Sequence, residues 1–396
     1  MVFDTKKVNL AEFSFGDKNL DRIFKKLGWH FSEKKELKVK VLVAIGVCWL
    51  PLVVLSLIHG NFWTGSIEGS FITSVEAQTR FLISLPILIL AEPLVSGKLV
   101  KTLVQFIDAG MIPKDQVAEF ESIIKSKINF LQSPWTDFFL LVICYIQVVS
   151  ILFFEAQYTS VAAWQFERNN GEPFLNMVGK WAVIVSRPFT LFFIYRWILR
   201  VLVWGRILAK VAQLNLCLSP FHADKVGGLG FLAFSISYFA PVCLAISVIL
   251  AGNMADLMIV DGMMLVDFRL TLFCYILFVA GFFTYPLFVF SKKLLDFKEK
   301  SIFELYDGIQ QVYNKANLKS FNAGTDHATN SEDVPYISSF SDFNAVLENV
   351  LNMRLILFQI RDLLPLMFLT LFPFLFVILI EIPLAEIISR LISTMF

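Results

Sequence analysis

The sequence carries little charge. Lys, Arg, Asp and Glu make up 17% of its 396 residues, whereas a soluble domain carries roughly a quarter. Hydrophobic residues make up 57%, and the mean hydropathy is +0.68. Because too little charge is left to cover the surface of a soluble protein of this length, lipid must cover part of it. The net charge of +1 gives no global electrostatic case for binding nucleic acid.

Common motifs of enzyme and metal sites are also missing. The five cysteines stand singly with no CxxC pair, which offers neither a disulfide framework nor a zinc site. The four histidines form no HExxH motif, and no GxSxG elbow or GK[ST] phosphate loop occurs. We therefore expect no cofactor and no metal, and an enzyme is the less favoured class.

Long apolar runs dominate what the sequence does contain. Seven of them can cross a hydrocarbon core of ~30 Å, and each must be helical because an open sheet would leave backbone groups unpaired in lipid. Residues 1–40 contain no apolar region of a cleavable signal peptide, so the first run is expected to direct insertion. The sequence predicts an all-α, polytopic transmembrane bundle of about seven spans: Val41–Ile58, Phe81–Ser96, Phe138–Phe154, Trp181–Trp204, Leu229–Ala251, Leu270–Phe290 and Leu363–Ile380.

Lys and Arg alternate between the connections. Residues 1–40 hold ten of them and 98–133 hold five, whereas 60–79 and 252–268 hold none. Since cytoplasmic loops are enriched in these residues, the N-terminus is expected inside, in a multi-pass protein of the cytoplasmic (inner) membrane.

This orientation divides the chain into four parts. Residues 1–40 form a cytoplasmic amphipathic N-terminal segment. Residues 41–290 form a six-helix transmembrane core with a cytoplasmic helical hairpin at 98–133. Residues 291–361 form a cytoplasmic helical segment with a flexible loop at 322–335, and 362–396 contain the last span and a tail that is either interfacial or re-entrant.

Charged residues within or near the spans are the candidates for a transport path or gate, because such charges usually face the bundle interior, a wet cavity or a partner. In the fourth run, Arg196 and Arg200 share a helix face and Arg187 points to the other side. Glu92 precedes Pro93, where we expect the helix to break or kink. A pore-lining role and a structural ion pair both remain open for these residues. The full set is Arg187, Arg196, Arg200, Glu92 and Glu381.

Prolines are frequent inside the predicted spans. Each removes a backbone donor, so that the freed carbonyl must meet a neighbour or water. Discontinuous helices of this kind are common in transporters and channels. The pattern favours a gated bundle over a passive anchor.

A glycine-rich motif, Phe-His-Ala-Asp-Lys-Val-Gly-Gly-Leu-Gly-Phe at 221–231, precedes the fifth run. Amides at the helix N-terminus beside a lysine can bind an anion or a lipid phosphate, and the His-Asp pair can respond to pH. The alternative is a capped, membrane-anchored helix start. The candidate residues are His222, Asp224, Lys225, Gly227 and Gly228.

This motif resembles the His-Pro-Asp-x-x-Gly-Gly-Leu-Gly-Phe signature of an uncharacterised family of bacterial multi-spanning integral membrane proteins. Ala223 stands where that signature has proline. The stretch from Arg187 to Arg200 and the segment from Ser341 to Arg354 look similar as well. The resemblance implies a membrane bundle and a bacterial setting, and it implies no activity.

The favoured function is a channel or secondary transporter for a small ion or solute. Anions are slightly favoured because the deepest charges are arginines. One alternative is a signalling, defence or assembly component that acts through cytoplasmic partners of residues 291–360. A second is a membrane-embedded enzyme acting on a lipid or envelope precursor through His222 and Asp224. The expected partners are the bilayer and the small ion or solute, a homo-oligomer stays open, and no nucleic acid is expected.

Overall fold

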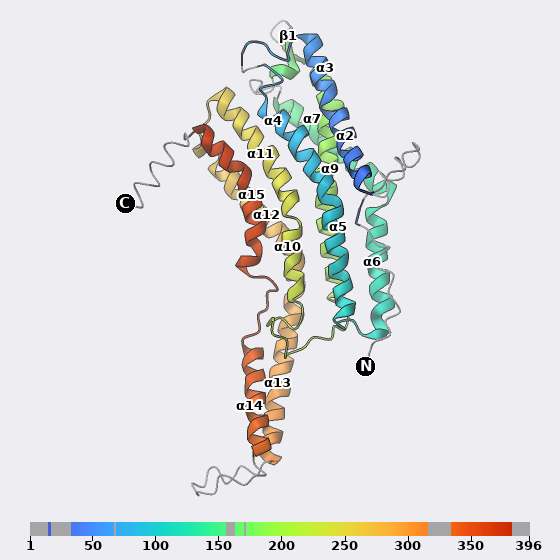
Figure 1. Ribbon diagram of the computed structural model, residues 1–396, viewed down its shortest axis with the longest axis vertical. Helices are drawn as coiled ribbons and strands as arrows, with labels where there is room; N and C mark the ends of the chain where they lie inside the picture. The colour runs from blue at the N-terminus through green and yellow to red at the C-terminus, as the bar shows by residue number, and fades with distance from the viewer. Residues whose placement is uncertain are drawn as a thin grey trace, which may run out of the picture.

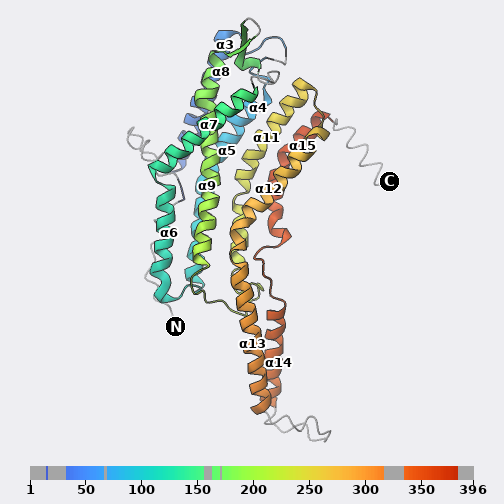
Figure 2. The same ribbon diagram turned by 180° about the vertical axis from the view of Figure 1, so that it is seen from behind.

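The computed structural model describes residues 15–16, 33–66, 69–155, 163–169, 172–315 and 334–381. Long helices lie roughly side by side in an elongated bundle, and one pair of helices, α13 and α14, projects from one end of it (Figures 1 and 2). This all-α, polytopic architecture is the one that the apolar runs predict.

Six helical stretches within the described residues are long and apolar enough to cross a membrane. In chain order they comprise α2 (Glu33–Cys48) with α3 (Leu50–His59); α4 (Val75–Gln78), η2 (Thr79–Ser84) and α5 (Leu85–Asp108); α7 (Pro134–Glu155); η6 (Gly230–Ala233), α10 (Phe234–Tyr238) and α11 (Ala240–Asp261); η7 (Leu265–Phe268) with α12 (Arg269–Phe288); and α15 (Ile360–Glu381).

The fourth predicted span also forms a helix, but this helix is not among the six that are apolar enough to cross a membrane. Its elements are α8 (Met177–Trp181), η5 (Ala182–Ser186) and α9 (Arg187–Val211). Arg187, Arg196 and Arg200, the three arginines within the predicted span, are buried, and α9 packs against α5, α6, α7 and α12. Because neighbouring helices surround α9, protein rather than lipid meets its polar side chains, and a helix too polar for a lipid-facing span is accommodated inside the bundle.

Two predicted helix boundaries were wrong. Of the break or kink expected at Pro93, the break is absent, since α5 continues through this residue from Leu85 to Asp108. The fifth span was expected to end at Ala251, but α11 continues to Asp261, and Gly262 ends it with a left-handed backbone at φ 66°. Helices in proteins owe most of their stability to tertiary packing, so local sequence signals do not predict either extension.

Neighbouring side chains take up carbonyls that prolines leave free. Pro51 cannot bond to the carbonyl of Val47, four residues earlier, and Nε1 of Trp181 donates to that oxygen at 3.2 Å. The carbonyl of Ile184, four residues before Pro188, accepts from the hydroxyl of Tyr145 at 2.9 Å. At these two positions the freed carbonyl meets a neighbour, one of the two outcomes that a membrane interior requires.

Two further elements lie at opposite ends of the bundle. At the end near α3, β1 (Phe166–Asn169) pairs with β2 (Glu172–Leu175) in an antiparallel hairpin that was not expected from the sequence. Near the other end, η3 (Lys114–Gln116) leads into α6 (Val117–Leu131). The buried face of α6 is an apolar stripe at helical spacing, formed by Phe120, Ile124, Ile128 and Leu131.

The projecting pair consists of α13 (Ser291–Lys315) and α14 (Val334–Leu351), which pack against each other. The helix α13 follows α12 almost directly. The loop predicted at 322–335 was placed slightly too long, since α14 begins at Val334. The rest of that loop, the tail 382–396 and most of the amphipathic segment predicted at 1–40 lie outside the described residues.

Candidate functional site

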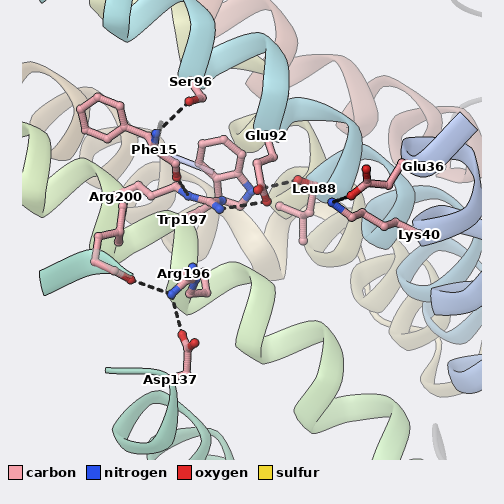
Figure 3. A network of polar contacts seen from close by, with 11 residues as sticks. Phe15, Glu36, Lys40, Leu88, Glu92, Ser96, Asp137, Arg196, Trp197 and Arg200 are labelled. Atoms are coloured by element: carbon pink, nitrogen blue, oxygen red, sulfur yellow. Dashed lines mark hydrogen bonds and ion pairs between the residues drawn. The ribbon is translucent and has the colours of Figure 1, made fainter. Parts of the chain in front are cut away.

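A network of buried charges lies on one face of α9 (Figure 3). Arg196 and Arg200 are one helical turn apart, and their side chains are 1% and 2% exposed. A guanidinium so far from water is stable only with charged or hydrogen-bonding partners. The contacts of these two arginines therefore define the site.

Arg200 joins α9 to α5. Its Nη2 lies 2.9 Å from Oε2 of Glu92, and its Nε donates to the carbonyl of Phe15 at 3.0 Å. The guanidinium also lies over the ring of Trp197, 4.6 Å from the ring centre. Nε1 of Trp197 donates to the carbonyl of Leu88 on α5 at 3.0 Å. The ion pair of Arg200 with Glu92 and the hydrogen bond from Trp197 to Leu88 thus join the two helices, whereas the cation–π contact lies within α9.

Arg196 joins α9 to α6 and α7. Its Nη1 lies 2.5 Å from Oδ1 of Asp137 and donates to the carbonyl of Leu131 at 2.9 Å. Asp137 stands in the first turn of α7, where the helix dipole favours a carboxylate. Asp137 was not among the candidates predicted from the sequence, although its place one residue before an apolar run marks it as a charge at a span boundary.

The five path candidates do not form one site. Glu92 and Arg200 pair, and Arg196 lies one turn away. Arg187 is also buried, but it lies nine residues from Arg196, about 14 Å along the helix. Glu381, at the end of α15, accepts from the backbone N–H of Leu265 at 2.7 Å. Arg187 and Glu381 are therefore outside the network.

Asp256 on α11 is a further buried carboxylate that was not predicted from the sequence. It accepts from the hydroxyl of Ser74 at 3.0 Å and from the backbone N–H groups of Val75 and Glu76 at 2.7 and 3.0 Å. These N–H groups begin α4 and have no partner within that helix. Asp256, which belongs to α11, thus caps the N-terminus of α4 and fixes α4 against α11.

The glycine motif forms a loop around the carboxylate of Asp224. Oδ1 accepts from the N–H groups of Val226 and Gly228 at 3.0 and 3.1 Å, and Oδ2 accepts from the N–H of Gly230 at 2.8 Å. Gly227 and Gly228 have φ values of 68° and 97°, a region that favours glycine. Amides that a bound anion would need here donate to Asp224 itself.

The electrostatics of this loop stabilise the ionised carboxylate. Burial raises the pKa of Asp224, but the three backbone hydrogen bonds and His222 together lower it more, so the pKa lies below its ordinary value of 3.8. Nδ1 of His222 lies 2.9 Å from Oδ1 of Asp224, and the imidazole is half exposed. The predicted His-Asp pair is therefore present at the surface of the loop.

The same loop holds the connection between α14 and α15. Nη2 of Arg354 donates to the carbonyl of Asp224 at 3.0 Å, and the backbone N–H of Arg354 donates to the carbonyl of Lys225 at 2.9 Å. Lys225 has a φ of 57°, the only positive value among described non-glycine residues. The side chain of Lys298 on α13 donates to the carbonyls of Leu351 and Met353. The motif thus fastens the projecting helices to the bundle.

An apolar cavity of about 420 Å³ lies elsewhere, between η2 and α5, α11 and α15. Its walls include Ile83, Val248, Phe372 and Phe376. None of the arginines or carboxylates of the α9 network lines it. A cavity with such walls suits hydrocarbon rather than a hydrated ion.

Comparisons of the chain with models of protein families, with curated proteins and with solved structures find no match. Within the described residues, no group of three or more His, Cys, Asp or Glu side chains could hold a metal ion. The function is therefore inferred from the geometry of the chain itself.

Proposed function

We propose that the protein is a channel or secondary transporter for a small ion or solute, with anions slightly favoured. The buried pairs of Arg196 with Asp137 and Arg200 with Glu92 carry this proposal. Ionisable groups are costly inside a membrane bundle, and they commonly mark substrate and ion pathways. Anions are favoured because the two arginines are almost fully buried, whereas Asp137 and Glu92 are 18% and 17% exposed.

The proposed membrane is the bacterial inner membrane, with the N-terminus inside. In that orientation the projecting α13 and α14 are cytoplasmic, which agrees with the Lys and Arg content of the connections. The described arrangement corresponds to a closed state, because each arginine of the network is occupied by a carboxylate. An entering anion would compete with Glu92 for Arg200, and its departure would restore the pair.

A flux assay in proteoliposomes tests this function. Glu92→Gln and Arg196→Ala are each expected to lower the flux of a common anion at least about tenfold, because removing one charge of a pair changes the field along the path. Chloride, nitrate and acetate serve as probes. Lys210→Ala is the matched control, since Lys210 is an exposed cation on the same helix.

Size-exclusion chromatography must show that each variant is folded before its flux is compared. Wild-type flux in both Glu92→Gln and Arg196→Ala would remove the α9 network from the mechanism. Absence of flux for small anions, cations and neutral solutes in the wild type would reject the transport class.

One observation favours a second function, assembly through a cytoplasmic partner. The pair α13 and α14 projects well beyond the bundle (Figures 1 and 2). It carries Phe303 and Tyr306 one turn apart on α13, 71% and 52% exposed. Exposed aromatic side chains outside a lipid-covered region are typical of protein contacts.

Affinity purification from the native membrane, with quantification of each co-purifying protein, tests this alternative. A partner is expected in a stoichiometric ratio, and Phe303→Asp should reduce its recovery at least about tenfold because a charge replaces an aromatic contact. Glu304→Lys, an equally exposed change next to it, is expected to reduce recovery less. Absence of a stoichiometric partner, or equal recovery with Phe303→Asp, would contradict this function.

A further inference from the structure

Phe15 lies between α5 and α9, and the residues that it contacts there are far from it in the sequence. Its backbone N–H donates to the hydroxyl of Ser96 at 2.9 Å, and its carbonyl accepts from Nε of Arg200 at 3.0 Å. Its ring meets the indole of Trp204 edge to face, with the ring centres 6.2 Å apart. Figure 3 shows this residue beside Ser96 and Arg200 at the edge of the charge network.

The N–H, the carbonyl and the ring of Phe15 thus each have a chemically complementary contact in the bundle. Its side chain is among the largest that are fully buried, at 1% exposure. The amide meets an acceptor, the carbonyl meets a cation, and the ring meets an aromatic surface. Such a set of contacts is the kind that a ligand site provides, in which apolar walls surround a few placed polar groups.

Two hydrogen-bond donors of α9 beside Phe15 have no acceptor in the part of the chain that the structure describes. Nη1 of Arg200 and Nε1 of Trp204 are buried and have no hydrogen-bond partner among the described residues. The two residues are one turn apart on α9 and both contact Phe15. A buried donor without a partner is destabilising, so an occupant with more acceptors than one carbonyl would bind more favourably.

We propose that Ser96, Arg200 and Trp204 form a binding site for a small carboxylate that bears an aromatic or branched apolar group, and that Phe15 is its intramolecular competitor. A carboxylate replaces the carbonyl of Phe15 at Arg200, and its second oxygen accepts from a donor that Phe15 leaves unused. Guanidinium groups match carboxylates in both charge and geometry. The apolar group takes the place of the Phe15 ring against Trp204.

This site deepens the proposed transport function by naming a substrate class, and transport of the bound ligand rests on that function. The ligand reaches Arg200 only when Phe15 leaves, so ligand binding and displacement of Phe15 are linked. Glu92 remains the neighbouring carboxylate of Arg200. A neutral apolar amide would gain less than a carboxylate, since it would supply only one acceptor and no charge.

Calorimetric titration of the detergent-solubilised full chain with N-acetylphenylalanine tests the proposal. This probe has the ring and amide of Phe15 and a carboxylate in place of its carbonyl. Phe15→Ala is expected to bind it at least about tenfold more tightly than the wild type, because the competing segment loses the ring that packs against Trp204. N-acetylphenylalanine amide, which lacks the carboxylate, and N-acetylalanine, which lacks the ring, are each expected to bind Phe15→Ala at least about tenfold more weakly.

Two further variants keep the test decisive. Phe15→Leu preserves an apolar side chain and should give an affinity between those of the wild type and Phe15→Ala, and it replaces Phe15→Ala if that variant does not fold. Trp204→Phe in the Phe15→Ala background keeps a ring but removes the Nε1 donor, and it should weaken binding several-fold. Equal affinities of the wild type and a folded Phe15 variant, or no binding by either, would overturn the proposal.

Flux of the same probe separates this proposal from the proposed function. Binding of the probe to Phe15→Ala, with no flux of the probe or of any small ion or solute, supports the site and rejects the transport function. Anion flux without binding of the probe rejects the site and leaves the transport function in place.

Discussion

Replacing Glu92 by leucine is expected to lower the free energy of unfolding by about 3–5 kcal/mol. The reason is that Arg200, 2% exposed, keeps its charge and loses the carboxylate 2.9 Å away. The double variant Glu92→Leu/Arg200→Met should recover most of this loss, since a buried ion pair is often no more stable than an apolar pair of similar volume. Reversible unfolding in mixed detergent micelles measures all three proteins.

A surface pair provides the control for this cycle. Lys300 and Glu304 are 3.7 Å apart and 75% and 67% exposed, so Glu304→Leu should change stability by less than about 1 kcal/mol. If Glu92→Leu were as mild as Glu304→Leu, the Glu92–Arg200 pair would not be buried as described. A double variant less stable than Glu92→Leu would show that Arg200 is held by its other contacts instead.

Replacing Asp224 by alanine is expected to release the connection between α14 and α15. The change removes the acceptor for three backbone N–H groups, and hydrogen bonds to a charged group contribute about 1.5–3 kcal/mol each. Because the loop is partly exposed and water can replace some of these bonds, the expected net loss is about 2–4 kcal/mol. Limited proteolysis should show faster cleavage near Arg354, whose side chain donates to the carbonyl of Asp224.

The pH dependence of the free energy of unfolding provides an independent measurement of the role of Asp224. The pKa of Asp224 in the folded protein lies below its ordinary value of 3.8. Its contribution to stability is therefore complete above that value and is lost as pH falls through the folded pKa. Between about pH 4 and pH 2 the wild type should lose stability more steeply than Asp224→Asn, which has no proton to gain. Glu304→Gln is the control, because the Glu304 carboxylate is 67% exposed, and equal slopes for wild type and Asp224→Asn would contradict this role.

The sequence by itself determined the helical bundle. Apolar runs of membrane length have no other stable conformation in lipid, so six of the seven predicted spans recur among the described helices that could cross a membrane. The amphipathic stripe of α6 was equally visible, because its period of 3.6 residues is a local property. The arginines of the fourth run marked a helix with a polar interior face, since such charges are costly against lipid.

Only the tertiary structure decided which partners these charges have. Arg196 meets Asp137 at a separation of 59 residues, and the carbonyl of Phe15 meets Arg200 at a separation of 185. Such pairings depend on how the helices are placed around α9, which hydrophobic periodicity leaves open. The helix cap of Asp256 depends on the same packing, because it joins backbone N–H groups about 180 residues away in the sequence.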